Sequence, residues 1–186
     1  NIGLVSPIGD QTNIGIYMLA TNNLFHIPGP LTEEQYISNP QQSNPVYKAR
    51  DERRYNRFIR IGTTFDHKFD AMNEISAMAF VNPKDLDRSE RGTYRDFTRY
   101  HLGGNLMYTN NYSFSSTVSN KIITGIDEAY QDGAILFYTL SETNGRGDVL
   151  KDNKREGANT FGAFFQDAVK VGKDWSFIVG GRWDDI

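Results

Sequence analysis

The stretch that most constrains the fold is the last one, where two kinds of side chain alternate. From Trp175 to Asp184 the odd-numbered positions hold Trp, Phe, Val, Gly and Trp, and the even-numbered positions hold Ser, Ile, Gly, Arg and Asp. A similar stretch begins at Phe161, and a Gly-Lys-Asp turn at positions 172–174 separates the two. Because successive side chains of a strand point to opposite faces, this pattern predicts a β-hairpin.

Two tryptophans, Trp175 and Trp183, fall on the same face of the last predicted strand, eight residues apart. A strand rises ~3.3 Å per residue, so eight residues span roughly 26 Å, or roughly 20 Å across a membrane if the strand is tilted by about 40°. That height is close to the apolar band between the two aromatic girdles of an outer-membrane barrel. Tyr100 and Tyr108 repeat the spacing elsewhere in the chain. We therefore expect these four residues to form membrane girdles. The alternative is a soluble sheet whose tryptophans share a face by chance.

Composition excludes several classes of function. The 186 residues carry a formal net charge of -3 with Lys and Arg spread along the chain, so no basic block marks a nucleic-acid surface. The absence of Cys excludes disulfides, Cys-ligated zinc and thiol catalysis. The sequence contains no apolar run of about 18 residues, so we predict no transmembrane helix. The chain does not begin with Met and its last predicted strand runs almost to its final residue, so we expect a piece of a larger domain.

Further period-two stretches are separated by connections of unequal length. Besides the last hairpin, we predict strands at Asn1–Ser6, Ile14–Ala20, Tyr55–Phe69, Asn73–Val81, Arg99–Tyr108 and Asn120–Tyr130. Long polar connections at Asn22–Arg54, Asn82–Phe97 and Gln131–Asn159 alternate with shorter turns near Asp10, Asp70, Asn111 and Lys173. Long connections at one end only are typical of outer-membrane barrels, whose long loops are extracellular. The predicted fold class is all-β: an antiparallel up-and-down meander of about eight strands from a larger transmembrane β-barrel.

One short helix is predicted inside the first long connection. Thr32 and Gln35 have the spacing of a capping box, in which each side chain accepts a hydrogen bond from the other residue's backbone N–H. Pro40 would end the helix soon afterwards.

Several segments resemble the barrel of TonB-dependent outer-membrane receptors. The tail Phe161-Gly-Ala-Phe-Phe-Gln-Asp, followed by Gly180-Gly-Arg-Trp-Asp, resembles the recurring barrel hairpin of that family. The segments similar to its ferric-citrate and siderophore branch are Tyr94-Arg-Asp-Phe-Thr-Arg-Tyr-His-Leu-Gly-Gly-Asn105, Asp127-Glu-Ala-Tyr-Gln-Asp-Gly133 and Gly29-Pro-Leu-Thr-Glu-Glu-Gln35. The resemblance implies that residues 1–186 are a partial barrel domain, without the plug and the remaining strands.

The resemblance also implies a function. Receptors of this family close about 22 strands around a plug and import iron chelates with energy passed on by TonB. The implied partners are a ferric siderophore or ferric citrate, the TonB complex through a missing N-terminal region, and the lipid of the outer membrane of a Gram-negative bacterium. The chelate would be the transported ligand, and no cofactor is implied.

Catalysis gains little support from the sequence. The three histidines, His26, His67 and His101, are far apart and lack the spacing of a zinc site, and no nucleophile elbow or phosphate-binding loop occurs. We therefore expect neither an enzyme nor a metal site. The alternative function is a soluble or surface β-domain that binds or cleaves carbohydrate, in which Trp and Tyr would stack on sugars in one cleft.

Arginines near the loop ends suit a receptor for an anionic chelate, because guanidinium groups bind carboxylates in a bidentate manner. Arg60, Arg99 and Arg182 have the parity of a lumen face, and His101 shares that face with Arg99. Arg99 and His101 are the main predicted pair of ligand contacts. Two more predicted contacts lie in or at the base of the extracellular connections, namely Arg95 and Arg155. The alternative is that these arginines pair with neighbouring carboxylates such as Asp66, Asp96 and Asp184 and line a polar wall.

Overall fold

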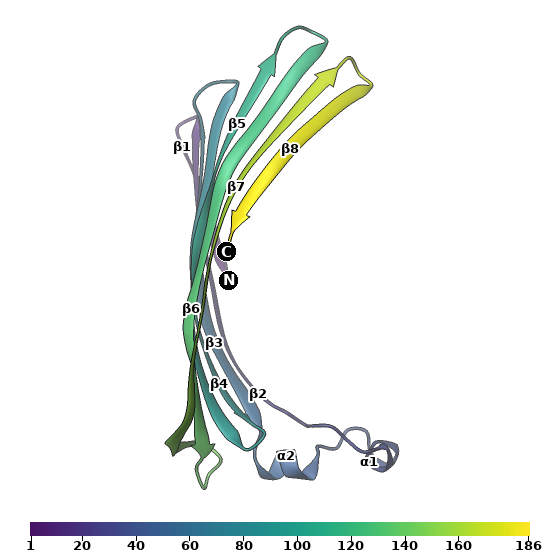
Figure 1. The fold of residues 1–186 in the computed structure, drawn as a ribbon, viewed down its shortest axis with the longest axis vertical. Coiled ribbons are helices and arrows are strands. Elements are labelled where there is room, and N and C mark those ends of the chain that lie inside the picture. The colour runs from purple at the N-terminus through teal and green to yellow at the C-terminus, as the bar shows by residue number, and fades with distance from the viewer.

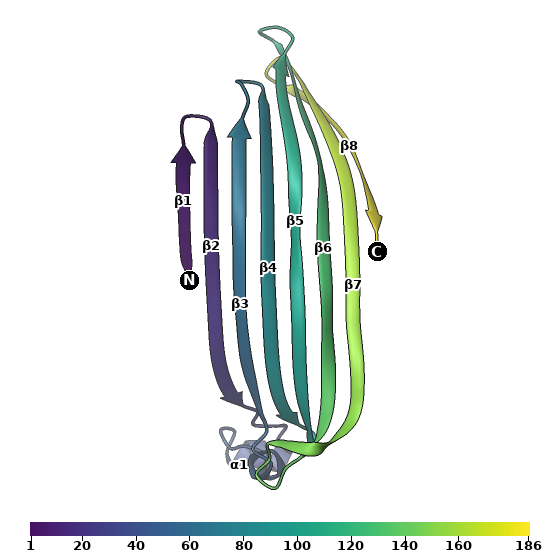
Figure 2. The ribbon, with the colours of Figure 1, turned by 90° about the vertical axis from the view of Figure 1, so that its left-hand side faces the viewer.

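The computed structural model describes all residues, 1–186, as one β-sheet with two short helices. In chain order its elements are β1 (Ile2–Ile8), β2 (Thr12–His26), α1 (Glu33–Ser38), α2 (Pro45–Ala49), β3 (Arg53–Lys68), β4 (Asn73–Glu90), β5 (Thr93–Ser113), β6 (Val118–Leu140), β7 (Arg146–Val171) and β8 (Trp175–Asp185). The strands lie side by side in sequence order, each antiparallel to the next (Figure 1, Figure 2). The sheet curves but does not close, since β1 and β8 each keep one unpaired edge. The predicted antiparallel meander of eight strands is confirmed. Neither helix has the length and apolar composition needed to cross a membrane.

The middle strands are longer than the sequence pattern indicated. The region Asn82–Phe97, predicted as a loop, instead completes β4 and begins β5. Its tight turn is made by Arg91 and Gly92, whose φ angles of 54° and 76° are typical of a two-residue hairpin. The region Gln131–Asn159 likewise consists mainly of the ends of β6 and β7. Both loop predictions were wrong because neither region alternates apolar and polar residues: Asn82–Phe97 is largely polar on both faces, and Ala134–Leu140 is largely apolar on both.

Only the connection between β2 and β3 is long, and it holds both helices. The predicted capping box is present in α1: Thr32 Oγ1 accepts a hydrogen bond from the Gln35 N–H at 3.3 Å, and Gln35 Oε1 accepts one from the Thr32 N–H at 3.0 Å. Sequence reasoning missed α2, in which Pro45 occupies the first turn and the Asn44 side chain accepts from the Val46 N–H at 3.0 Å.

The opposite end of the sheet has short turns (Figure 2). In the turn between β3 and β4, Asp70 Oδ1 accepts hydrogen bonds from the backbone N–H groups of Met72 and Asn73 at 2.7 and 2.8 Å. Hydrogen bonds from the Asn73 side chain and then from the Met72 N–H hold the pKa of the Asp70 carboxyl below its ordinary value.

A single-layer sheet has no core, and only 8 of the 186 residues are buried. The register therefore divides the side chains between two faces. Trp175, Trp183, Tyr100 and Tyr108 share one face, here called the apolar face. The two tryptophans expose 66% and 60% of their surface, and Ile, Leu, Val and Phe side chains on the same face are similarly open. So large an exposed apolar surface requires contact with something other than water.

Candidate functional site

The register also shows where each predicted ligand residue lies. The face opposite the tryptophans, here called the polar face, carries Arg60, Arg95, Arg99, His101 and Arg182. Arg155 lies on the apolar face, because it is opposite Ala134, which in turn is opposite Thr98. It is therefore separated from the other predicted contacts by the sheet itself.

Arg182 of β8 is held by two carboxylates, one on its own strand and one on β6, two strands away. Its guanidinium donates to Asp127 of β6 at 2.7 and 2.9 Å and to Asp184 of β8 at 2.8 and 3.0 Å. The intervening β7 position is Gly162, where any side chain would collide with the guanidinium. Glycine thus lets one arginine reach across β7 and join β8 to β6 through charge-assisted hydrogen bonds.

Arg99 makes a similar crossing. Its side chain passes over Gly133 of β6 and its guanidinium contacts the Glu156 carboxylate of β7. For Arg99 and Arg182, the arrangement is the one foreseen as the alternative, in which an arginine pairs with a carboxylate of the wall. Their charges are engaged within the sheet.

Arg155 is paired on the other face. Its Nε and Nη2 donate to the two carboxylate oxygens of Asp132 at 2.9 and 2.6 Å. The pair joins β6 and β7 next to Tyr100, which lies opposite Asp132.

Sequence reasoning predicted Arg95 as a contact but missed Arg54 and Arg88, which form a row with it on the polar face at the helix end of the sheet. Arg54 of β3, Arg88 of β4 and Arg95 of β5 lie directly opposite one another. Glu90 contacts Arg88 and accepts from Arg54 at 3.3 Å, whereas the Arg95 guanidinium stacks 5.1 Å from the Phe137 ring centre. Like charges directly opposite on a sheet repel each other, so this arginine row carries a cost in stability. The strand register brings these arginines together. The sequence did not reveal that register, because these strand ends are polar.

The base of the long connection is bonded to the β4–β5 turn, next to this arginine row. Glu52 is fully buried, and its Oε1 accepts from the Arg91 N–H at 3.0 Å. Burial raises the pKa of the Glu90 carboxyl, but hydrogen bonds and charge from Arg88 and Arg54 outweigh it and hold the pKa below its ordinary value. The helix-bearing connection is thus anchored beside the cations.

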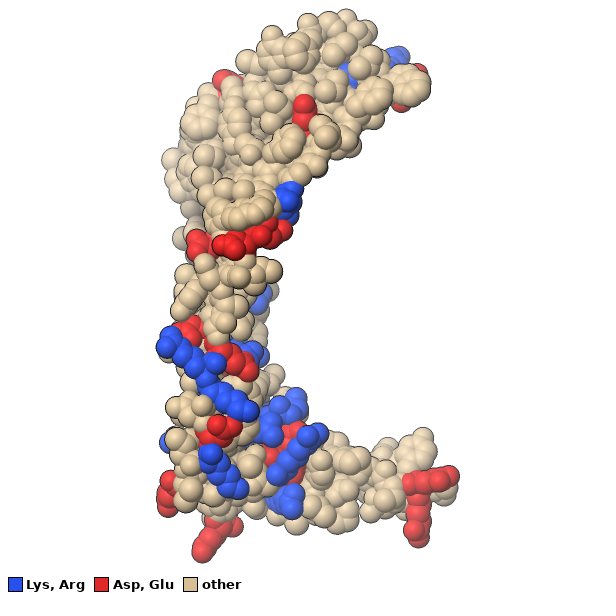
Figure 3. Space-filling model, in the orientation of Figure 1, with Lys and Arg blue, Asp and Glu red and all other residues tan.

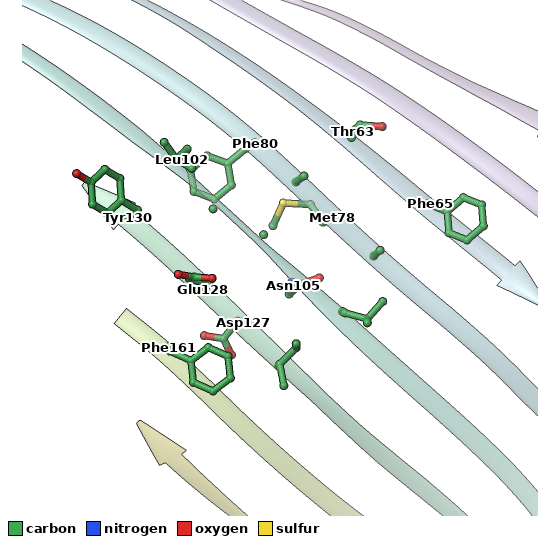
Figure 4. A pocket seen from close by; sticks show the side chains of 16 residues that line it. Thr63, Phe65, Met78, Phe80, Leu102, Asn105, Asp127, Glu128, Tyr130 and Phe161 are labelled. Carbon is green, nitrogen blue, oxygen red and sulfur yellow. The ribbon is translucent and has the colours of Figure 1, made fainter. Parts of the chain in front are cut away.

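Charge is unevenly distributed along the sheet. Figure 3 shows charged side chains gathered over the end near the helices, while most of the other end is free of them. The apolar face instead has a groove of about 630 Å³ floored by small residues of β4 and β5. Phe65 and Phe161 lie at opposite sides of it, and Glu128 and Tyr130 are near one end (Figure 4).

Comparison with solved structures finds the same arrangement of strands in transporters and an import receptor. The unliganded ferric citrate transporter FecA superposes with a TM-score of 0.81 at 13% identity, over 94% of this chain and 27% of that one. The open form of the ferric-catecholate import receptor Fiu from E. coli K12 gives 0.66 at 10% identity, over 98% and 35%. The RagAB peptide transporter gives 0.67 at 11% identity, over 97% and 26%.

At these identities the likeness shows the fold: eight strands arranged as in the barrels of such receptors. The chain spans about a quarter to a third of the length of these structures. No protein-family model matches the sequence, and no curated protein matches it.

Proposed function

We propose that this chain is part of the barrel of a TonB-dependent receptor in the outer membrane of a Gram-negative bacterium, which imports a ferric chelate of the citrate or siderophore type. In this arrangement the apolar face contacts lipid and the polar face lines the lumen. Trp175, Trp183, Tyr100 and Tyr108 are the girdle residues, and TonB acts through a region outside this chain. The likeness to the barrels of FecA and Fiu supports the proposal.

The arginine row is the observation that carries the ligand assignment. Three guanidinium groups, from Arg54, Arg88 and Arg95, lie opposite one another, and the one carboxylate in contact with this row, Glu90, contacts only Arg54 and Arg88. An anionic ligand would relieve their mutual repulsion and accept charge-assisted hydrogen bonds. The row lies on the polar face, at the end where the long connection leaves the sheet. We place the first contact of the chelate there. Arg99, paired with Glu156, serves as wall structure.

The alternative, a carbohydrate-binding domain, would bring aromatic side chains together in one cleft. The tryptophans, Tyr100 and Tyr108 are instead spread along the apolar face, with Trp175 and Trp183 at opposite ends of β8. That distribution favours a lipid-facing surface.

The test is equilibrium binding of ferric citrate and of a ferric catecholate to the intact receptor in detergent, comparing the parent with Arg54→Ala and Arg88→Ala. Loss of one charge-assisted contact costs about 1.5–3 kcal/mol, which is roughly a tenfold to hundredfold loss of affinity. Arg57→Ala is the matched control, because Arg57 lies on the same strand but on the other face, paired with Asp87 at 3.1 Å. Equal affinity of parent and both variants for every chelate that the parent binds would refute the assignment.

A further inference from the structure

One carboxylate on the apolar face has no partner. Glu128 of β6 lies opposite Gly104 of β5 and Phe161 of β7. It is exposed, and its carboxylate forms no hydrogen bond or ion pair, whereas Asp132, the next carboxylate on that face of β6, binds Arg155. A charged side chain that faces lipid is costly, and such side chains pair with a partner or serve a function. Glu128 therefore calls for a cation or a hydrogen-bond donor.

Glu128 lies just inside one aromatic girdle. Four aromatic residues on successive strands form a diagonal on the apolar face, each displaced by two residues toward the short turns: Tyr100 of β5, Tyr130 of β6, Phe161 of β7 and Trp183 of β8. Tilted strands produce such a diagonal where they cross a level girdle. Only one residue separates Glu128 from Tyr130, on the side of the short turns. The carboxylate thus lies within the apolar band, close to its edge.

The groove of about 630 Å³ runs from Glu128 across β5 and β4 (Figure 4). Its floor follows one row of the register, in which Glu128 is opposite Gly104, Gly104 is opposite Ala79, and Ala79 is opposite Thr63. Neighbouring strands are about 4.8 Å apart, so the floor from Glu128 to Thr63 is roughly 14 Å long. A straight hydrocarbon chain can lie along it.

The width of the groove decides what can lie in it. Leu102 and Leu106 border the groove on either side of Gly104. Their Cα atoms are four residues, or ~13 Å, apart along β5, and the two leucine side chains occupy part of that width. A helix with its side chains is about 10–12 Å in diameter and cannot reach the floor between them. The groove therefore fits a single hydrocarbon chain better than a helix of a partner protein.

We propose that this groove is a binding site for a membrane lipid whose headgroup carries a primary ammonium group. One acyl chain lies along the small residues of the floor, and the ammonium donates to the Glu128 carboxylate near the girdle. A primary ammonium supplies both the charge and the N–H donors that this carboxylate lacks, whereas a quaternary ammonium has no N–H donor. The inference rests on the proposed function, in which the apolar face contacts lipid.

The test is native mass spectrometry of the intact receptor with dioleoyl phosphatidylethanolamine. The comparison lipid is dioleoyl phosphatidylcholine, which has the same chains and a quaternary ammonium. We expect the parent to bind phosphatidylethanolamine at least tenfold more tightly, because one charge-assisted hydrogen bond distinguishes the two lipids. Glu128→Gln should remove that preference. Ala79→Leu, which fills the floor, should weaken the binding of both lipids at least tenfold.

Two matched controls repeat these substitutions outside the groove. Glu74→Gln changes a carboxylate on the polar face, and Ala20→Leu enlarges an alanine on the apolar face of β2. Both should bind the two lipids as the parent does.

Equal affinity of the parent for the two lipids, or an unchanged preference in Glu128→Gln, would overturn the assignment. Unchanged binding by Ala79→Leu would do the same, as would a protein segment or a second copy of the chain detected as added mass in place of lipid. None of these results concerns the chelate, so Arg54→Ala still supports or refutes the proposed function separately.

Discussion

Replacing Glu90 by Gln probes how the arginine row is held together. The Glu90 side chain is 10% exposed and contacts both Arg88 and Arg54. The substitution preserves shape but removes the only carboxylate in contact with that row, so Arg54, Arg88 and Arg95 would face one another without compensation. Charge-assisted hydrogen bonds contribute about 1.5–3 kcal/mol, and repulsion of opposed like charges adds to the loss. We expect opening of the β4–β5 hairpin to become easier by roughly that amount.

Amide hydrogen exchange of the β4–β5 hairpin in the intact receptor measures this opening directly. A change of about 1.5–3 kcal/mol corresponds to roughly tenfold to hundredfold faster exchange of the amides around Arg91, after correction for intrinsic rates. Glu142→Gln is the control, because Glu142 lies in the β6–β7 loop and forms no ion pair. Unchanged protection in Glu90→Gln would refute the view that this carboxylate holds the arginine row.

The contacts of Glu90 with Arg88 and Arg54 also make the stability of the β4–β5 hairpin depend on pH. The pKa of Glu90 is lower in the folded sheet than in an unfolded chain, where it is about 4.3. The stabilisation is therefore present above pH ~4.3 and is lost as the pH falls through the lower folded-state pKa. The difference in exchange between parent and Glu90→Gln should shrink over that acidic range.

Three further predictions concern the wall and the turns. Gly162→Val should break the contacts of Arg182 with its two carboxylates and lower the yield of heat-resistant folded barrel. Gly157→Val should have little effect, because a Cβ at position 157 would meet no atom closer than the Gln131 carbonyl oxygen at 3.5 Å. Leu106→Arg should reduce membrane assembly more than Met107→Arg, because an arginine facing the middle of the bilayer costs about 2–4 kcal/mol. Asp70→Ala should accelerate exchange at the β3–β4 turn; the effect should be present above pH ~3.9 and fade as the pH falls through the lowered folded-state pKa. Equal behaviour of the members of either pair, or an unaltered turn, would contradict these expectations.

Much of the fold follows from the period-two pattern. Where one face is apolar and the other is polar, as from Trp175 to Asp184, alternation gives both the strand and the face of each side chain. The capping box at Thr32 was similarly readable, because its two hydrogen bonds join residues close in sequence.

The rest depended on contacts distant in sequence. Beyond the apolar part of the sheet, paired strands satisfy each other's backbone while their side chains are polar on both faces, so Asn82–Phe97 looked like a loop. Predicting the arginine row requires the register of three strands. Predicting the contact of Arg99 with Glu156 requires the knowledge that Gly133 lies between them. Propensity and spacing carry neither kind of information.

The most direct test of the central claim, that the apolar face contacts lipid and the polar face lines an aqueous lumen, is a nitroxide scan along β8. The chain has no native cysteine, so single variants Phe177→Cys, Ile178→Cys, Val179→Cys and Gly180→Cys can be spin-labelled in the intact receptor in liposomes, after any cysteine elsewhere in it is replaced. We expect labels at 177 and 179 to be relaxed mainly by oxygen, which concentrates in lipid, and labels at 178 and 180 mainly by a water-soluble nickel chelate. A uniform response at all four positions, or the reverse alternation, would contradict the account.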